Sequence, residues 1–165
     1  MMKLSNNLKK HQKIGIIFTI LYFISVFFFF FLSLQSGSAS SNQSSFVTEA
    51  IIKIILFFNK NWQYDYDIVH NIVRKLIGHF GYSSMMGILG FLSWYFLRLK
   101  MTESLLINFI IGLLIASVSE ILQMIPNDRG PSFGDLLINY MGYLSGLLIM
   151  FIIIILFNKR GNYDN

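Results

Sequence analysis

The sequence predicts an all-α fold: an integral membrane bundle of four transmembrane helices, with an interfacial amphipathic helix in the first outer loop. Hydrophobic residues make up 55% of the 165 residues, and the mean hydropathy is +0.60. Charged residues make up only 13%, against about 25% in a typical soluble domain. A soluble fold of this size could not bury so much apolar surface, whereas a bilayer covers it with lipid.

Four apolar stretches are long enough to cross a bilayer: residues 15–34, 77–97, 104–125 and 133–157. At about 1.5 Å per residue, each spans roughly 30 Å of hydrocarbon. We expect helices because backbone groups in lipid must pair within their own segment, and because no stretch alternates polar and apolar residues as a barrel strand does. The first apolar run is longer than the ~7–15 residues of a signal peptide core, so a retained helix is expected.

The long segment between the first two spans is predicted to lie outside the membrane. Residues 35–45 are polar, and residues 36–45 are rich in serine, which is typical of a flexible loop. Residues 46–58 are strongly apolar but too short to span, so we expect a helix on the outer membrane surface or packed across the bundle. Asp67 is expected to cap a further helix that leads into the second span.

Charge and composition restrict the classes of function. The formal net charge is +5, but the lysines and arginines form no single patch, so nucleic acid is not an expected partner. More of them flank the helix ends on the side of the two termini, which predicts a multi-pass protein with both termini cytoplasmic. The absence of cysteine excludes disulfides, thiol catalysis and thiolate metal sites.

Ionisable side chains occur at the outward-facing ends of three predicted spans. His79 begins the second span from outside, Glu120 lies near the outer end of the third, and Asp135 begins the fourth. Such groups are costly in lipid and are functional candidates by default. The sequence therefore predicts an outward-facing polar pocket. Its predicted ligand-binding residues are Lys75, His79, Glu120, Gln123, Arg129, Asp135 and Asn139.

Several of these residues also have a purely structural interpretation. Asp135 occupies the acidic position of a capping box, so its role can be limited to capping the last helix. Glu120 can pair with Arg129, and His79 can simply lie at the wet interface. Lys75 can extend its ammonium group to lipid headgroups as an anchor.

Small residues accompany the polar faces of the last two spans. Gly112 and Ala116 share the polar face of the third span, and Gly142 and Gly146 share that of the fourth. Small residues allow helices in membranes to approach closely. We therefore expect these faces to pack against one another.

Three segments together resemble the VanZ-like family. The first is Ser33–Gly37 followed by further serines, the second is Arg74–Phe80, and the third is Ser119–Gln123 with Arg129, Ser132, Asp135, Asn139, Gly142 and Gly146 behind it. The resemblance implies a bacterial cytoplasmic-membrane protein and, for some members, reduced sensitivity to teicoplanin and related lipoglycopeptides. One departure is that Gly78 and Gly81 stand where many members have bulkier residues.

Three functions remain open at this point. The leading hypothesis is non-enzymatic binding of an envelope lipid headgroup, a lipid-linked cell-wall intermediate or a lipoglycopeptide, with an effect on teicoplanin sensitivity; the charge of the ligand is undecided. The alternative is an intramembrane enzyme acting on a lipid headgroup, with His79, Glu120 and Asp135 as catalytic candidates. No metal-binding spacing such as HExxH occurs, and no cofactor is expected. An oligomeric transporter is less favoured because the inner halves of the spans are apolar.

Overall fold

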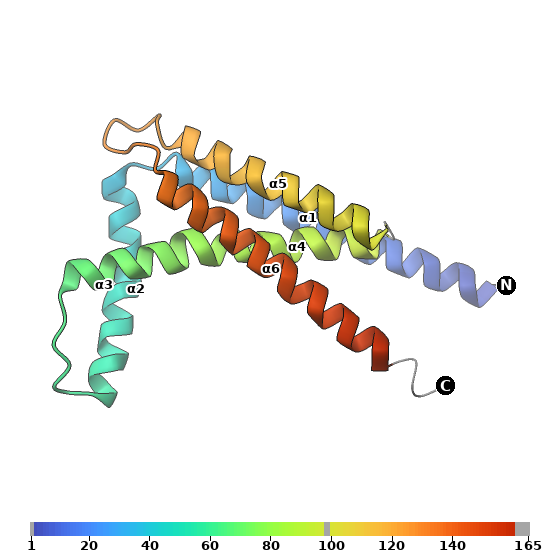
Figure 1. The fold of residues 1–165 in the computed structure, drawn as a ribbon, viewed down its shortest axis with the longest axis horizontal. Helices are drawn as coiled ribbons and strands as arrows, with labels where there is room; N and C mark the ends of the chain where they lie inside the picture. Colours follow the sequence, from blue (N-terminus) through green and yellow to red (C-terminus); the bar gives the residue numbers. More distant parts are fainter. Residues whose placement is uncertain (1, 98–99, 161–165) are drawn as a thin grey trace.

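The computed structural model describes residues 2–97 and 100–160, and every element in that part of the chain is a helix. The elements are α1 (Met2–Ser33), α2 (Gly37–Phe58), α3 (Tyr66–Val73), the π-helix η1 (Arg74–Gly81), α4 (Tyr82–Phe96), α5 (Met101–Leu122) and α6 (Phe133–Arg160). In Figure 1, α1, α4 and α5 run along the long axis of the molecule, α6 crosses them obliquely, and α2 runs across that axis. The predicted all-α fold is confirmed.

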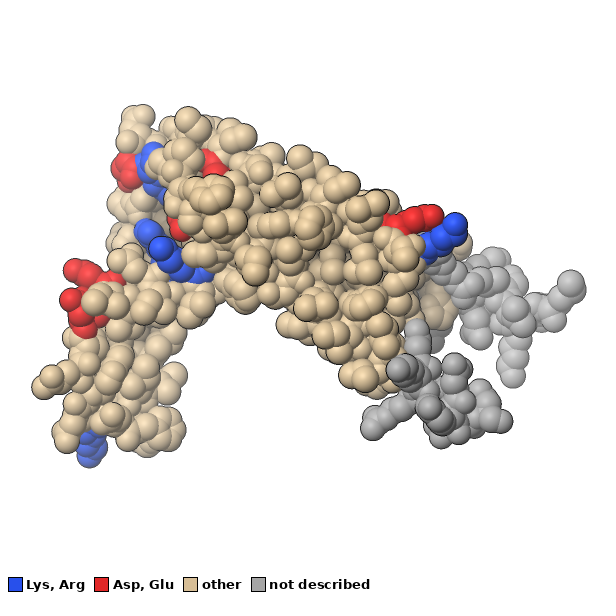
Figure 2. All heavy atoms as spheres, viewed as in Figure 1, with Lys and Arg blue, Asp and Glu red and all other residues tan. Residues whose placement is uncertain are grey.

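Three helices in the described part are long and apolar enough to cross a membrane: His11–Ser33, Met101–Leu122 and Phe133–Phe157. They correspond to the predicted first, third and fourth spans, although α5 ends at Leu122 rather than at residue 125. The predicted second span falls on η1 and α4, and α4 alone has only 15 residues. On the face shown in Figure 2, charged side chains gather toward the two ends and leave the flank between them uncharged. This distribution is that of a membrane protein.

The central helix of the bundle is α4, which packs against α1, α5 and α6. Its inward side chains Met86 and Phe91 are almost completely buried and join a core with Tyr22 and Tyr143. Large apolar side chains on the outside are exposed instead, and Phe27 on α1 is 75% exposed. In a bilayer these outward side chains meet lipid, so no second layer of protein is needed to cover them.

Glycines bring α4 and α6 into backbone contact. A Cβ atom at Gly146 would overlap the carbonyl oxygen of Ser84, and one at Gly87 would overlap that of Tyr143. A Cβ at Gly142 would likewise meet the backbone of Phe80. The predicted packing role of the α6 glycines is therefore confirmed, since any side chain would separate the two helices.

A buried polar cluster ties α6 to α5 and α1 in the middle of the bundle. The Tyr143 hydroxyl donates to Asn108 Oδ1 at 2.9 Å and lies 3.1 Å from the Tyr22 hydroxyl. Asn108 Nδ2 donates to the Ser104 carbonyl oxygen at 2.8 Å. The expectation that the polar face of the third span points toward the fourth is correct at this level.

The serine-rich stretch is helical from Gly37 onward, so the flexible loop predicted over residues 36–45 is wrong beyond Ser36. Ser36 caps α2, because its hydroxyl accepts from the Ala39 N–H at 3.2 Å. Within the first turns, Ser44 Oγ donates to the Ser40 carbonyl oxygen at 3.1 Å. A serine hydroxyl that donates to a carbonyl oxygen one turn earlier forms its hydrogen bond within the helix and does not interrupt it. The predicted apolar helix over residues 46–58 is the second part of this longer helix.

The cap of α3 also differs from the expectation. Asp65, not Asp67, is the N-cap: its Oδ1 accepts from the Asp67 N–H at 2.9 Å and from the Ile68 N–H at 3.2 Å. Both aspartates precede the same apolar stripe, so spacing alone does not choose between them. Asp67 lies in the first turn of α3, where a negative charge is also favourable.

Candidate functional site

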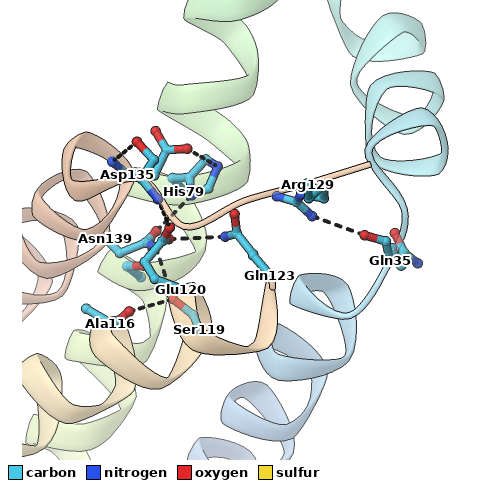
Figure 3. Close-up of polar contacts among 11 residues, drawn as sticks. Gln35, His79, Ala116, Ser119, Glu120, Gln123, Arg129, Asp135 and Asn139 are labelled. Carbon is cyan, nitrogen blue, oxygen red and sulfur yellow. Dashed lines mark hydrogen bonds and ion pairs between the residues drawn. The ribbon is translucent and has the colours of Figure 1, made fainter. Parts of the chain in front are cut away.

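The polar network at one end of the bundle centres on Asn139, which is 1% exposed. Its Nδ2 donates to Ser119 Oγ and to Glu120 Oε1, both at 3.2 Å. Because the amide nitrogen must face the carboxylate, Oδ1 is the atom that meets Ser83 and His79. His79 Nδ1 lies 3.1 Å from that oxygen and is therefore the donor. Asn139 thus links η1, α4 and α5 from a single position on α6, as Figure 3 shows.

Glu120 joins the end of α5 to the start of α6. Its Oε1 also accepts from Gln123 Nε2 at 3.1 Å, and its Oε2 accepts from the Ser132 N–H at 2.9 Å. The structural pairing of Glu120 with Arg129 is not formed. Arg129 Nη1 instead donates to the carbonyl oxygen of Gln35 at 3.3 Å, at the far side of the loop (Figure 3).

Asp135 does not complete a capping box. Ser132 Oγ accepts from the Asp135 N–H at 3.2 Å, so Ser132 supplies the cap of α6. The reciprocal bond is missing because the Ser132 N–H donates to Glu120 instead. The Asp135 carboxylate is directed at the imidazole: its Oδ2 lies 3.8 Å from His79 Nε2. His79 is therefore held from both ring nitrogens by residues of α6.

A cavity of about 140 Å³ lies beside this network, enclosed by the end of α1, the start of α2, η1 and the loop before α6. Three of the predicted ligand-binding residues line it, namely His79, Gln123 and Arg129. Glu120, Asp135 and Asn139 do not line the cavity but contact residues that do. Further polar lining residues, absent from the predicted site, are Ser33, Gln35, Ser40, Gln43, Ser44 and Arg74.

The structure does not bring Lys75 into the cavity. Lys75 is exposed, and its neighbour Arg74 lines the cavity together with His79. The sequence prediction spaced Lys75 and His79 by one α-helical turn. In a π-helix, hydrogen bonds run from i to i+5, so residues five apart come onto one face. In the π-helical segment η1, Arg74 therefore lies on the same face as His79, where α-helical spacing predicted Lys75.

The described residues that line the cavity include two cationic side chains, Arg74 and Arg129, and no acidic one. Arg129 is half-buried, and burial and the neighbouring Arg74 charge lower its pKa from the ordinary arginine value. Arginine remains charged under such conditions. Arg74 Nε is buried without a hydrogen-bond partner, and so is Oε1 of Gln35. The cavity therefore presents positive charge and unused polar atoms.

The loop that carries Arg129 is fixed to the start of α2 by Asp128. Asp128 Oδ2 accepts from the Ser38 N–H at 3.2 Å. Backbone N–H groups of Gly37 and Ser38 lower the pKa of the Asp128 carboxyl, so it stays ionised at the positive end of α2. This contact holds Arg129 over the cavity. Within the described residues, no group of three His, Asp or Glu side chains could hold a metal ion.

Comparison with known proteins matches residues 18–156 to the VanZ/LLP1 family. No curated protein and no solved structure matches the chain. The matched region contains the polar network, the cavity and the glycine contacts between α4 and α6. Because it also covers most of the sequence, the chain belongs to the VanZ/LLP1 family.

Proposed function

We propose that this chain is a multi-pass protein of the bacterial cytoplasmic membrane that binds the headgroup of an anionic envelope lipid in the cavity beside η1. The observation that carries this proposal is that Arg74 and Arg129 line the cavity without an acidic side chain among the described lining residues. Arginine forks suit phosphate and carboxylate oxygens. The two arginines therefore favour a negatively charged ligand, a choice that the sequence left open.

A lipid is favoured over a soluble anion because one wall of the cavity is apolar. Phe29 and Leu32 of α1 and Val47 of α2 line it, together with Ile77 of η1. Ile77 and the lining residue Tyr82 are 44% and 38% exposed, so the cavity reaches the outer surface of the helices that face lipid. A headgroup can enter there while its hydrocarbon chains remain in the bilayer.

The size of the cavity favours a small headgroup. Ligand pockets usually measure roughly 300–1,000 Å³, and this cavity measures about 140 Å³. A lipoglycopeptide or a lipid-linked glycan would place only part of its structure inside. An effect on teicoplanin sensitivity would then be indirect, and measuring susceptibility of cells with and without the chain tests it.

The proposed topology has four spans. The described helix continues without interruption from α3 through η1 into α4, so the second crossing is assigned to η1 and α4 together. With α2 across the outer end of the bundle, the cavity faces the cell exterior, and both termini are cytoplasmic. Arg74, His79 and Arg129 then lie at the outer membrane interface.

The test is native mass spectrometry of protein extracted gently from its own membrane. Wild-type chain should carry an anionic lipid that is lost in Arg74→Ala and Arg129→Ala. Lys75→Ala is the matched control, because it removes the same charge from an exposed neighbour and should keep the lipid. A lipid kept in both arginine variants, or absent from wild type, contradicts the proposal.

Glu120→Gln tests the network behind the cavity. Three donors meet the Glu120 carboxylate, and a glutamine amide brings its own donor into that group, so one bond must be lost. An amide nitrogen at the Oε2 position releases the Ser132 N–H at the start of α6. At the Oε1 position it releases Gln123 and Asn139, the residue that orients His79. We expect reduced lipid retention, measured in the same spectra, with the helix content by circular dichroism unchanged.

A second candidate function is catalysis on the bound headgroup. The observation that favours it is the geometry of His79, whose Nδ1 donates to Asn139 and whose Nε2 faces Asp135 at 3.8 Å while the residue lines the cavity. A general base needs a ring nitrogen that reaches the substrate, so this function requires Nε2 to turn from Asp135 toward the bound headgroup. Under this hypothesis, His79→Gln would abolish turnover of the bound lipid, seen as accumulation of the intact lipid.

A further inference from the structure

Within the described residues, the two arginines of the cavity form no close ion pair, although the carboxylates of Glu120, Asp128 and Asp135 lie near enough to act on the charge of Arg129. Neither Arg74 nor Arg129 takes part in an ion pair within 4.0 Å in that part of the chain. A guanidinium has five N–H donors. Arg129 uses Nη1 on the neutral carbonyl group of Gln35, and Arg74 Nε is buried without a partner. Several guanidinium N–H donors of the two arginines are thus left for a ligand.

The two guanidinium groups approach the cavity from different elements. Arg74 comes from η1 and Arg129 from the loop between α5 and α6, while α2 adds Ser40 and Gln43 as further lining residues. A phosphate monoester presents three terminal oxygens and carries about two negative charges near neutral pH. A phosphodiester has one terminal oxygen fewer and a single negative charge, so it offers the two guanidinium groups fewer acceptors and less charge.

We propose, on the basis of the headgroup-binding function above, that Arg74 and Arg129 together select a terminal phosphate monoester carried by a membrane lipid. The small volume of the cavity, about 140 Å³, is consistent with a bare phosphate rather than a phosphate extended by a sugar or glycerol. The apolar wall formed by Phe29, Leu32 and Ile77 receives the first part of the hydrocarbon chain.

The experiment compares two lipids with identical chains in neutral phosphatidylcholine nanodiscs that contain the full chain. Dioleoyl phosphatidic acid supplies the monoester, and dioleoyl phosphatidylglycerol supplies the diester. We expect the wild-type protein to bind the monoester at least about tenfold more tightly, which corresponds to about 1.4 kcal/mol. Arg74→Ala and Arg129→Ala should reduce this preference to less than about twofold, whereas Lys75→Ala should retain it.

Each other outcome has a definite meaning. Equal binding of the two lipids by wild type overturns monoester selection but leaves headgroup binding intact, and binding of neither lipid overturns both. Inorganic phosphate is the probe for the source of the ligand: if it binds as tightly as phosphatidic acid, the phosphate chemistry holds but the lipid does not. The comparison on wild type does not depend on folding of the variants. Arg74→Lys keeps the positive charge but loses the planar pair of guanidinium donors, so it should give an intermediate preference.

Discussion

Asn139 uses both ends of its amide, which makes it the most connected residue of the site. Its nitrogen donates to Ser119 and Glu120, and its oxygen accepts from His79 and Ser83. An aspartate could not donate, and a leucine could do neither. The side chain therefore determines which nitrogen of His79 carries the proton and which faces Asp135.

Replacing Asn139 by alanine should destabilise the protein. The change leaves buried polar atoms of His79 and Glu120 without partners, which typically costs about 1–3 kcal/mol. Thermal unfolding in detergent, followed by circular dichroism, measures the effect. Ser145→Ala on the same helix is the control, because Ser145 is only half-buried and its hydroxyl bonds to the Met141 carbonyl oxygen of its own helix. Equal melting temperatures for the two variants would contradict the role of Asn139.

The sequence predicted the residue types of the site better than their individual roles. The positions of His79, Glu120 and Asp135 near the ends of their predicted spans correctly indicated one level. Three helices carry these residues to the same end of the bundle. It could not separate Arg74 from Lys75, since that choice depends on an i to i+5 hydrogen-bond pattern that α-helical spacing does not contain. It also left out Gln35, whose neighbours were assigned to a loop.

At the scale of elements, glycine determines how η1, α4 and α6 pack. Gly78 and Gly81 both lie in η1, where a Cβ at Gly81 would be 3.2 Å from the Leu76 carbonyl oxygen. The same two glycines were the departure noted from the VanZ-like pattern. A Cβ at Gly78 would meet only the Arg74 side chain, at 3.9 Å, so of the two glycines only Gly81 is in a crowded position. The sequence signalled unusual packing here, but the π-helix itself was not predicted.

Gly146→Ala should separate α6 from α4. The added Cβ would overlap the Ser84 carbonyl oxygen, and backbone cannot yield as a flexible side chain does. Overpacking of this kind typically costs about 1–3 kcal/mol. Gly130→Ala is the matched control, because no atom lies within 4 Å of a Cβ built there. A shift in melting temperature for Gly146→Ala but not for Gly130→Ala is the expected result, and the reverse order would count against the contact.

At the scale of the whole molecule, the second half of α2 and the loop after it extend away from the bundle (Figure 1). Aromatic and apolar side chains there are exposed, including Phe57 at 78% and Phe58 at 82%. This surface suits the membrane interface, where amphipathic segments lie in the plane of the bilayer. Hydropathy predicted an apolar helix here because of its composition, but it could not show that the helix begins nine residues earlier, at Gly37 rather than at residue 46.

The chain contains no cysteine, so single cysteines can report on which side of the membrane each segment lies. Lys60 follows α2 and Lys100 precedes α5, and both side chains are exposed. If η1 and α4 cross the bilayer, a membrane-impermeant maleimide should label Lys60→Cys in intact cells and Lys100→Cys only after lysis. The unsubstituted chain gives the background. Labelling of both variants in intact cells would place residues 60 and 100 outside and remove the second span, whereas labelling of Lys60→Cys only after lysis would contradict the outward-facing cavity.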